Sequence, residues 1–328
     1  MSLTLDISAD TGVVELSEAG TQAVEEVASR LLPVVDGTID DRAWIAKAGL
    51  LSHDLPVALR KSLAAYRRDP GRTGALLIRG LPVDESRLPQ TPVVSGSAQR
   101  KATIPAAALM LVASALGNPI AFSQEKSGAM VQDVVPVPGN EEFQGNEGSV
   151  LLTFHNENAF HRHRPDYVLL LCLRADHDRT AGLRTVSIRQ VYETLGVRHR
   201  EALFSEEFVT APPPSFGSAS AESEPHAVLT GAQDDPDLMV DFAATTPLTE
   251  RAGDALAALQ SLFVAHALTH YLAPGDLAIV DNRVTVHGRT SFTPRYDGQD
   301  RWLQRTTVVQ NLRRSRIHRA GDGHVLAG

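Results

Sequence analysis

An imidazole and a carboxylate stand two residues apart in the chain, at His155 and Glu157. On a β-strand, residues i and i+2 point to the same side, whereas on a helix they point to different faces. The apolar stretch at residues 151–154 favours a strand that runs into this pair. We therefore expect both side chains to reach one metal ion from the same wall.

A second histidine, His287, follows an apolar strand at residues 277–280 and the turn-like pair Asp281-Asn282. Two imidazoles and one carboxylate can occupy one face of an octahedron and leave three positions open. That facial triad suits iron(II) with a chelating cosubstrate and O2. His155, Glu157 and His287 are therefore the predicted metal ligands and catalytic residues.

Arg301 follows His287 along the chain, just before the apolar segment that begins at Trp302. A guanidinium offers two parallel donors to a carboxylate, which a lysine cannot match. On a strand next to that of His287, Arg301 can hold the distal carboxylate of 2-oxoglutarate while the keto acid end chelates the iron. Each motif alone also occurs in structural roles, so the prediction depends on their occurring together.

Three stretches, with the spacing from His287 to Arg301, resemble the clavaminate synthase, asparagine oxygenase and arginine β-hydroxylase group of 2-oxoglutarate oxygenases. They are LLIRGLPVD (76–84), HNENAFHRHRPDYVLLLCLRADH (155–177) and PGDLAIVDNRVTVHGRTSFTPRYDGQDRW (274–302), within residues 74–316. The resemblance implies Fe(II), 2-oxoglutarate and O2, and the same three iron ligands. It implies Arg301 and, at a looser match, Thr185 as cosubstrate-binding residues. The implied fold is the double-stranded β-helix, a jelly-roll.

The resemblance also implies a free L-amino acid as substrate, bound at both of its charged ends. Arg305 lies on the strand face of Arg301 and would meet the α-carboxylate. Gln124 would contact the α-amino group, a role that Glu157 shares through its second oxygen. Asn156 stands where several relatives have threonine, and on a strand it points away from the metal.

Asp241 matches an aspartate that contacts the substrate side chain in this group. A buried carboxylate favours a cationic or hydrogen-bond-donating substrate tip. The arginine hydroxylase has a second acid where this chain has Met239, so arginine, lysine, citrulline, ornithine and asparagine all stay open. The implied reaction is hydroxylation at C3 or C4, in natural-product biosynthesis. The structural alternative is that Asp241 merely caps a turn.

Other activities remain as alternatives. A related oxygenase can desaturate or cyclise its substrate, and a jelly-roll can bind a ligand without catalysis. A halogenase needs a small residue in place of Glu157, so the carboxylate argues against it. His266 and His270 have the i, i+4 spacing of a zinc pair on a helix, but the glutamate of a metalloprotease motif is missing. His161 and His163 can also face the pocket.

The composition is that of a globular protein, with 328 residues, 43% hydrophobic and 21% charged. A net charge of −8 argues against a nucleic-acid partner; the basic residues at 313–319 are expected to form a solvated tail. Cys172 lies in an apolar run and is predicted to be a core residue. The absence of a signal-peptide pattern or membrane span makes a cytoplasmic setting the default.

The order of elements predicts a mainly β fold with helical flanks (α+β), in one domain over residues 1–328. Helices are expected at 17–32, 41–51 and 55–67 in a helical N-terminal region (about 1–70), and at 104–116 and 248–272. Strands are expected at 74–81, 130–135, 150–155, 167–173, 277–281 and 302–309. Residues 211–225 are a candidate lid or loop.

Overall fold

The computed structural model describes residues 12–32, 38–216 and 223–327. Within these ranges the helices are α1 (Glu18–Ser29), α2 (Arg42–Leu51), α3 (Val57–Arg68), α4 (Ile104–Leu116), α5 (Ile188–Val191), α6 (Val197–Leu203) and α7 (Glu250–His266). The four helices expected in the first third of the chain are confirmed, with ends that differ by a few residues. The fold is α+β, as expected.

Two sheets form the centre of the molecule. The nine-stranded sheet contains, in this order, β1 (Val13–Glu15), β2 (Ala75–Arg79), β14 (Leu277–Asp281), β7 (Tyr167–Arg174), β16 (Trp302–Val309), β4 (Asn118–Phe122) and β17 (Val325–Leu326). In the same sheet, β5 (Val131–Val134) also pairs with β16, and β3 (Ala98–Gln99) pairs with β5. The four-stranded sheet has the order β13 (Leu268–His270), β8 (Leu183–Ser187), β15 (Thr285–Arg289) and β6 (Leu152–His155). Two antiparallel pairs complete the strands. One is the hairpin of β10 (Leu229–Ala232) and β11 (Asp235–Leu238), and the other joins β9 (Phe208–Thr210) to β12 (Thr245–Pro247).

The side chains of β7 alternate between two cores. Leu169 and Leu171 pack with helices α1 to α4 on one face of the large sheet. Leu170 and Cys172 point to the other face, where they meet Leu183 of the small sheet. Because both faces are covered, the strand reads as one continuous apolar run in the sequence. The expected core position of Cys172 is confirmed, and burial raises the pKa of its thiol to about 12.

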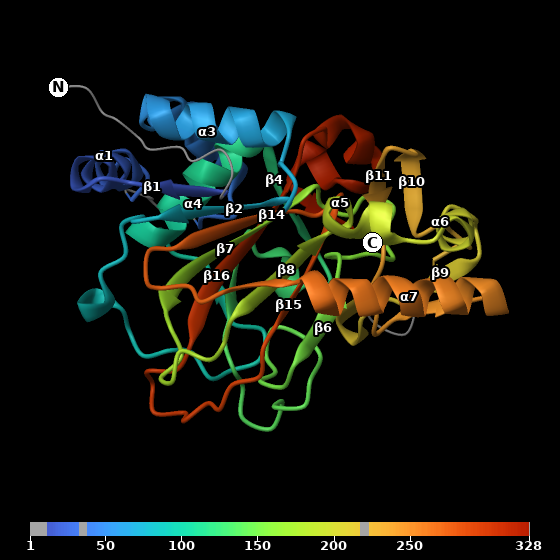
Figure 1. Ribbon diagram of the computed structural model, residues 1–328. Coiled ribbons are helices and arrows are strands. Elements are labelled where there is room, and N and C mark those ends of the chain that lie inside the picture. Colours follow the sequence, from blue (N-terminus) through green and yellow to red (C-terminus); the bar gives the residue numbers. More distant parts are fainter. Residues whose placement is uncertain (1–11, 33–37, 217–222, 328) are drawn as a thin grey trace.

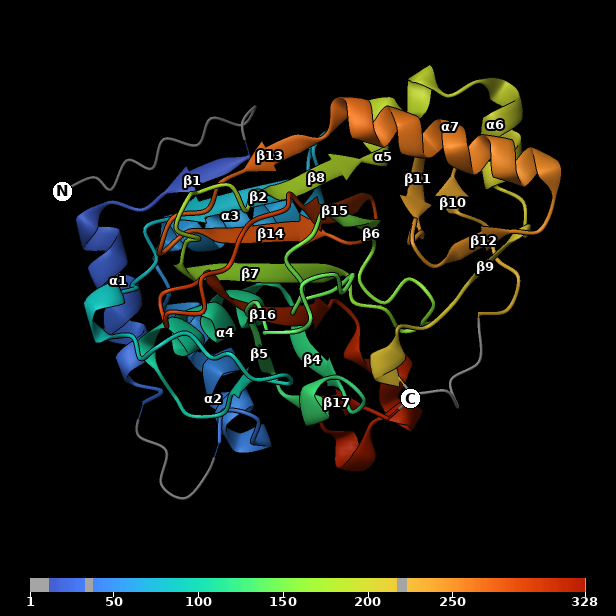
Figure 2. The ribbon, with the colours of Figure 1, turned by 90° about the horizontal axis from the view of Figure 1, so that it is seen from below.

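The small sheet also has one face toward the large sheet and one toward helices. Phe154, Val186 and Val286 alternate outward and pack with α5, α6 and α7. Their strand neighbours His155, Thr185 and His287 therefore point inward, toward the large sheet. Figure 2 shows α7 beyond β13 and β8, and α2 and α4 on the far side of β7 and β16; Figure 1 shows the same layers from another side. The candidate site lies in the space between the two sheets.

The helix expected at residues 248–272 is shorter than predicted. It starts at Glu250, after Thr249, whose Oγ1 accepts a hydrogen bond from the Ala252 amide, and it ends at His266. Ala267 has extended dihedrals, and β13 begins at Leu268. The i, i+4 helical pair of His266 and His270 is therefore wrong, since His266 ends a helix and His270 lies on a strand.

Part of the candidate lid at residues 211–225 is described. Residues Pro214–Phe216 form a short 3-10 turn, and Ser223 donates its backbone N–H to the carbonyl of Thr210. Residues 217–222 lie outside the described part of the chain, so the lid stays a prediction. No helix of the described ranges is both long and apolar enough to cross a membrane.

Candidate functional site

The three predicted metal ligands meet between the sheets. His155 and His287 are direct partners in the antiparallel pairing of β6 and β15, and their ring centroids are 4.4 Å apart. His287 Nε2 lies 3.8 Å from Glu157 Oε2, and one donor atom from each of the three residues lies within 4.8 Å of the others. The expectation that Glu157 lies on the strand is wrong, because β6 ends at His155 and Glu157 is in the turn that follows.

Hydrogen bonds and burial set the protonation of the two imidazoles. His155 Nδ1 lies 2.9 Å from the carbonyl oxygen of Thr153, so Nδ1 carries the proton and Nε2 keeps its lone pair. Burial, and then the neighbouring His155, lower the pKa of His287 to about 3. Nε2 of each ring can therefore serve as a ligand, and with one carboxylate the two imidazoles match the donor set of an iron(II) facial triad.

Glu157 presents its two oxygens to different neighbours. Oε2 is on the side of His287, while Oε1 accepts a hydrogen bond of 2.7 Å from Arg305 Nη1. Burial alone would raise the pKa of Glu157, but the positive charge of Arg305 and its hydrogen bond to the carboxylate outweigh this effect and lower the pKa. The carboxylate is therefore ionised, as a metal ligand must be.

Arg305 is the centre of a buried polar cluster. Besides Glu157, its Nη2 donates to Glu125 Oε2 at 3.0 Å and to Gln132 Oε1. Burial raises the pKa of Glu125, and Arg305 opposes this effect. Gln124, the residue predicted from sequence, does not line the cavity described below: its Oε1 accepts from Ser123 Oγ at 3.0 Å. Glu125 and Gln132 stand beside Arg305 instead.

A cavity of about 460 Å3 opens on this cluster. Its polar lining includes Glu125, Asn146, Glu157, Asp241 and Arg305. Met239 is not part of the lining. The cavity therefore has a cationic group and several carboxylates, as a site for a zwitterion requires.

Asp241 lies directly opposite His155, in an isolated antiparallel bridge. Its Oδ1 accepts a hydrogen bond of 2.8 Å from the Ala243 amide, so the turn-capping alternative is correct in part. The same residue lines the cavity, and its Oδ2 has no hydrogen-bond partner in the described residues. One oxygen caps the turn, and the other can receive a donor from a ligand.

A narrower pocket is lined by His287, Arg289 and Arg301, and it shares His155, Glu157 and Arg305 with the larger cavity. The guanidinium groups of Arg301 and Arg289 lie over the same ring, that of Phe292, at 5.8 and 5.2 Å from its centroid. Burial lowers the pKa of Arg301; burial and the charge of Arg301 lower that of Arg289 to about 9. Within the described ranges neither guanidinium forms a salt bridge, so this pocket has uncompensated positive charge.

Arg289 was not predicted from the sequence, although its spacing from His287 indicates that both side chains lie on the same face of a strand. It lies two residues beyond His287, and residues i and i+2 of a strand share a face. Thr185, the other predicted cosubstrate residue, is the direct cross-strand partner of His287, and its side chain is buried. Thr185 Oγ1 lies 3.2 Å from His270 Nε2, and Thr185 is not among the residues that line either pocket.

Two other clusters in the described residues contain histidines outside the triad. The rings of His161 and His163 are 5.9 Å apart, and burial lowers the pKa of His161 to about 4. His177 stands between Asp297, 3.1 Å from Nε2, and Asp300, 3.7 Å from Nδ1. Because the two acids face opposite nitrogens of one ring, this cluster ties together the loop before Arg301 rather than enclosing one ion.

Comparisons with known proteins agree with this geometry. A family model described as taurine catabolism dioxygenase TauD, TfdA family, matches residues 52–307. An L-asparagine oxygenase of Streptomyces coelicolor is 58% identical over 313 residues, which are 95% of this chain and 94% of that protein. Clavaminate synthase 2 of Streptomyces clavuligerus is 33% identical, over 86% of this chain and 89% of that protein.

Solved structures give the same result. A crystal structure of asparagine oxygenase in complex with Fe(II), 2S,3S-3-hydroxyasparagine and succinate has a TM-score of 0.94 at 57% identity, and covers 96% of this chain and 99% of that one. The non-heme iron oxygenase OrfP, in complex with Fe, succinate and (3S)-hydroxy-L-Arg, has a TM-score of 0.86 at 28% identity, with 96% and 99% coverage. The likeness therefore extends over nearly the whole chain.

Proposed function

The chain belongs to the TauD/TfdA family of dioxygenases, and we propose that within this family it hydroxylates free L-asparagine at C3. It is an Fe(II)/2-oxoglutarate-dependent amino acid hydroxylase. The observation that carries the choice of asparagine is the 58% identity to an L-asparagine oxygenase over 95% of the chain. The cavity chemistry, with the carboxylate of Asp241 opposite His155, supports the same choice.

His155, Glu157 and His287 would hold the iron, through Nε2 of each ring and Oε2 of the carboxylate. The neutral imidazole of His287 and the ionised carboxylate of Glu157 suit a divalent ion. Bound iron(II) supplies the redox chemistry by which 2-oxoglutarate and O2 become succinate and CO2 while one oxygen atom enters a C–H bond of the amino acid. The protein's own task is to position the two organic substrates around this ion.

Arg301 would bind the distal carboxylate of 2-oxoglutarate. Its guanidinium is buried and has no acidic partner among the described residues, so an incoming carboxylate would supply the missing charge. Arg289 adds a second positive charge to the same pocket. Thr185 stays a prediction here, since its hydroxyl is next to His270.

Arg305 would bind the α-carboxylate of the amino acid, and the acids beside it would receive the α-amino group. Glu125 and Glu157 both contact Arg305, so a zwitterion can insert between these charges and exchange partners with them. Gln124, expected at the amino group, is replaced in this proposal by Glu125, which lines the cavity.

Asp241 would accept a hydrogen bond from the side-chain amide of asparagine through Oδ2. One amide NH2 matches one free carboxylate oxygen. Glu147, a further acid of the cavity lining, already accepts from Ser95, Gly96 and Asn140. A guanidinium or ammonium tip needs more acceptors than this, which argues against arginine and lysine.

We also infer a double-stranded β-helix, because the two sheets face each other around the site as in the jelly-roll expected from sequence. A single domain over residues 1–328 remains our proposal. The lone buried thiol of Cys172 supports a reducing, cytoplasmic setting. The role in natural-product biosynthesis expected from sequence is also kept as a proposal.

A panel of free L-amino acids tests the substrate. The protein is incubated with iron(II), 2-oxoglutarate, ascorbate and one amino acid, and the products are read by mass for a gain of one oxygen. We expect oxygen gain and succinate with asparagine, and hydroxylation at C3 by NMR. Equal or faster turnover of arginine, lysine, citrulline or ornithine would contradict the proposal.

A further inference from the structure

The segment at residues 240–242 joins the edge of the small sheet beside β6. The Asn156 amide donates to the carbonyl of Val240 at 2.8 Å, and the Phe242 amide donates to that of Phe154 at 3.1 Å. This pairing puts Asp241 opposite His155. The residue proposed to meet the substrate tip is therefore paired directly with the strand that carries a proposed iron ligand.

The side chain of Asn156 adds a second set of bonds at this point. It is 1% exposed, and its Oδ1 accepts from the Val240 amide at 2.9 Å. Its Nδ2 donates to the carbonyls of Asn282 and Thr285, at 2.9 and 3.0 Å. One buried amide thus joins the substrate-side segment to the turn before β15 and to the start of β15, two residues from His287.

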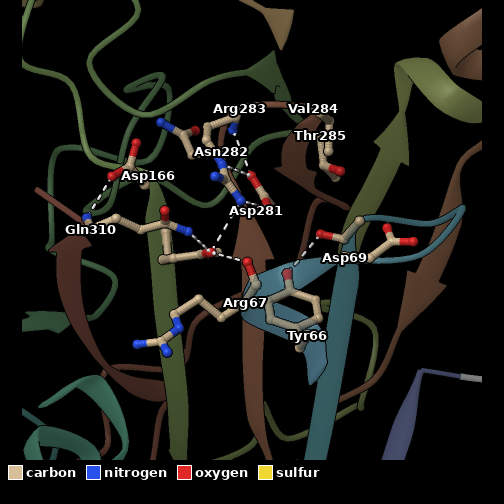
Figure 3. Close-up of polar contacts among 12 residues, drawn as sticks. Tyr66, Arg67, Asp69, Asp166, Asp281, Asn282, Arg283, Val284, Thr285 and Gln310 are labelled. Carbon is tan, nitrogen blue, oxygen red and sulfur yellow. Dashed lines mark hydrogen bonds and ion pairs between the residues drawn. The ribbon is translucent and has the colours of Figure 1, made fainter. Parts of the chain in front are cut away.

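Asn282 holds the backbone of Glu157, another of the three proposed iron ligands. It is fully buried, and its Oδ1 accepts from the Glu157 amide at 2.7 Å while its Nδ2 donates to the Glu157 carbonyl at 3.0 Å. Behind it, Arg283 donates to the buried Asp281 at 2.9 Å, which fixes the turn (Figure 3). The Asn156 side chain bonds the carbonyl of this same Asn282.

The side-chain amides of Asn282 and Asn156 therefore connect different segments. Asn282 fixes Glu157 but makes no bond to residues 240–242. Asn156 connects that segment, through Asn282 and Thr285, with the backbone that carries Glu157 and His287. Since both side chains are buried, removing one of their bonds leaves an unpaired polar group and moves the local backbone.

We propose that Asn156 is a positioning residue that couples amino acid binding to the iron centre. It fixes the position of Asp241 relative to the three iron ligands, so that the reacting carbon of the bound amino acid lies where the iron chemistry can reach it. This inference rests on the proposed function. Without Asn156, 2-oxoglutarate is still consumed but a smaller share of turnovers hydroxylates the amino acid.

The variant Asn156→Thr tests this coupling. Threonine has one hydroxyl and cannot make the three bonds of the amide. Two quantities are measured: the molar ratio of hydroxyasparagine to succinate, and the affinity for asparagine of the iron(II)- and 2-oxoglutarate-loaded protein under argon. We expect the ratio to fall to about half or less, and the affinity to fall about tenfold, the loss expected for one misplaced hydrogen bond to a charged group.

Tyr66→Phe is the matched control. The buried Tyr66 hydroxyl donates to the carbonyls of Gly74 and Ile279, away from the pockets, so its loss costs stability but leaves the site intact. We expect a lower melting temperature with an unchanged product ratio and asparagine affinity. If Asn156→Thr behaves like this control, the coupling role is wrong. Asn156→Ser carries the same test if the threonine variant does not fold.

The wild-type protein separates the two proposals. If it forms no hydroxyasparagine, asparagine is the wrong substrate, and the ratio and affinity are measured with the amino acid that it does hydroxylate. A wild-type ratio for Asn156→Thr with that amino acid then contradicts the coupling role alone.

Discussion

Arg301 lies directly before β16 and Arg305 lies on it, and both line the narrow pocket, yet their guanidinium groups have opposite surroundings. Arg305 donates to Glu157, Glu125 and Gln132. Arg301 has no salt bridge within the described ranges, and it shares the ring of Phe292 with a second cation, Arg289. One side of the centre is therefore self-paired, and the other carries unpaired positive charge.

The different surroundings of Arg301 and Arg305 determine how each guanidinium can receive a ligand. A carboxylate that enters beside Arg301 gains charge-assisted hydrogen bonds without breaking any of its existing salt bridges. An amino acid that enters beside Arg305 must instead exchange partners with Glu125 or Glu157. We therefore expect the cosubstrate site to be the more pre-formed of the two, with the amino acid binding after 2-oxoglutarate.

The largest effect is expected at Glu157, because this residue serves both sides. Glu157→Ala removes a proposed iron ligand and a partner of Arg305, so asparagine-dependent succinate formation should be abolished. Glu125→Ala is the control, since it removes a partner of Arg305 but no proposed ligand, and should keep measurable turnover. Full activity of Glu157→Ala would remove this carboxylate from the proposed coordination sphere.

A smaller and one-sided effect is expected at Arg301. Arg301→Gln deletes the proposed anchor of the distal carboxylate, so 2-oxoglutarate affinity should fall by roughly 30-fold or more, the loss typical of a truncated buried charge pair. Asparagine affinity of the cosubstrate-saturated protein should change little. Calorimetry under argon gives both values, and an equal loss of both affinities would contradict the separation of the two sides.

The smallest effect is expected at Asp241. Asp241→Ala removes one acceptor for the substrate amide, so asparagine affinity should fall on the order of tenfold. Affinity for 2-oxoglutarate should stay within about twofold of the wild-type value, which is smaller than the contribution of one hydrogen bond. Losses of similar size for both ligands would mean that the turn cap, which Asp241 provides through Oδ1, dominates its role.

Much of the scaffold was predictable because its strands are apolar on both faces. The run from Tyr167 to Arg174 and the strands at Leu277 and Trp302 read directly from sequence. The strands Leu183–Ser187 and Thr285–Arg289 were not assigned as separate elements. They are five residues long, and polar residues at inward positions, such as Thr185, His287 and Arg289, interrupt the apolar pattern.

The site was predicted in its parts but not in all its local geometry. His155 and Glu157 meet as their spacing suggested, although Glu157 reaches the site from a turn that Asn282 holds. That support depends on a contact between residues distant in sequence, which no local pattern reveals. Glu125 in place of Gln124 is a one-residue difference in a loop, where neither strand nor helix periodicity fixes the direction of a side chain.

A crystal structure of the protein with iron(II) and 2-oxoglutarate, prepared under argon, would locate both the metal ion and the cosubstrate. It should contain one iron ion on His155 Nε2, Glu157 Oε2 and His287 Nε2, with the distal carboxylate of 2-oxoglutarate on Arg301. An ion that binds elsewhere, or a distal carboxylate that contacts Arg305 while Arg301 stays unpaired, would contradict it.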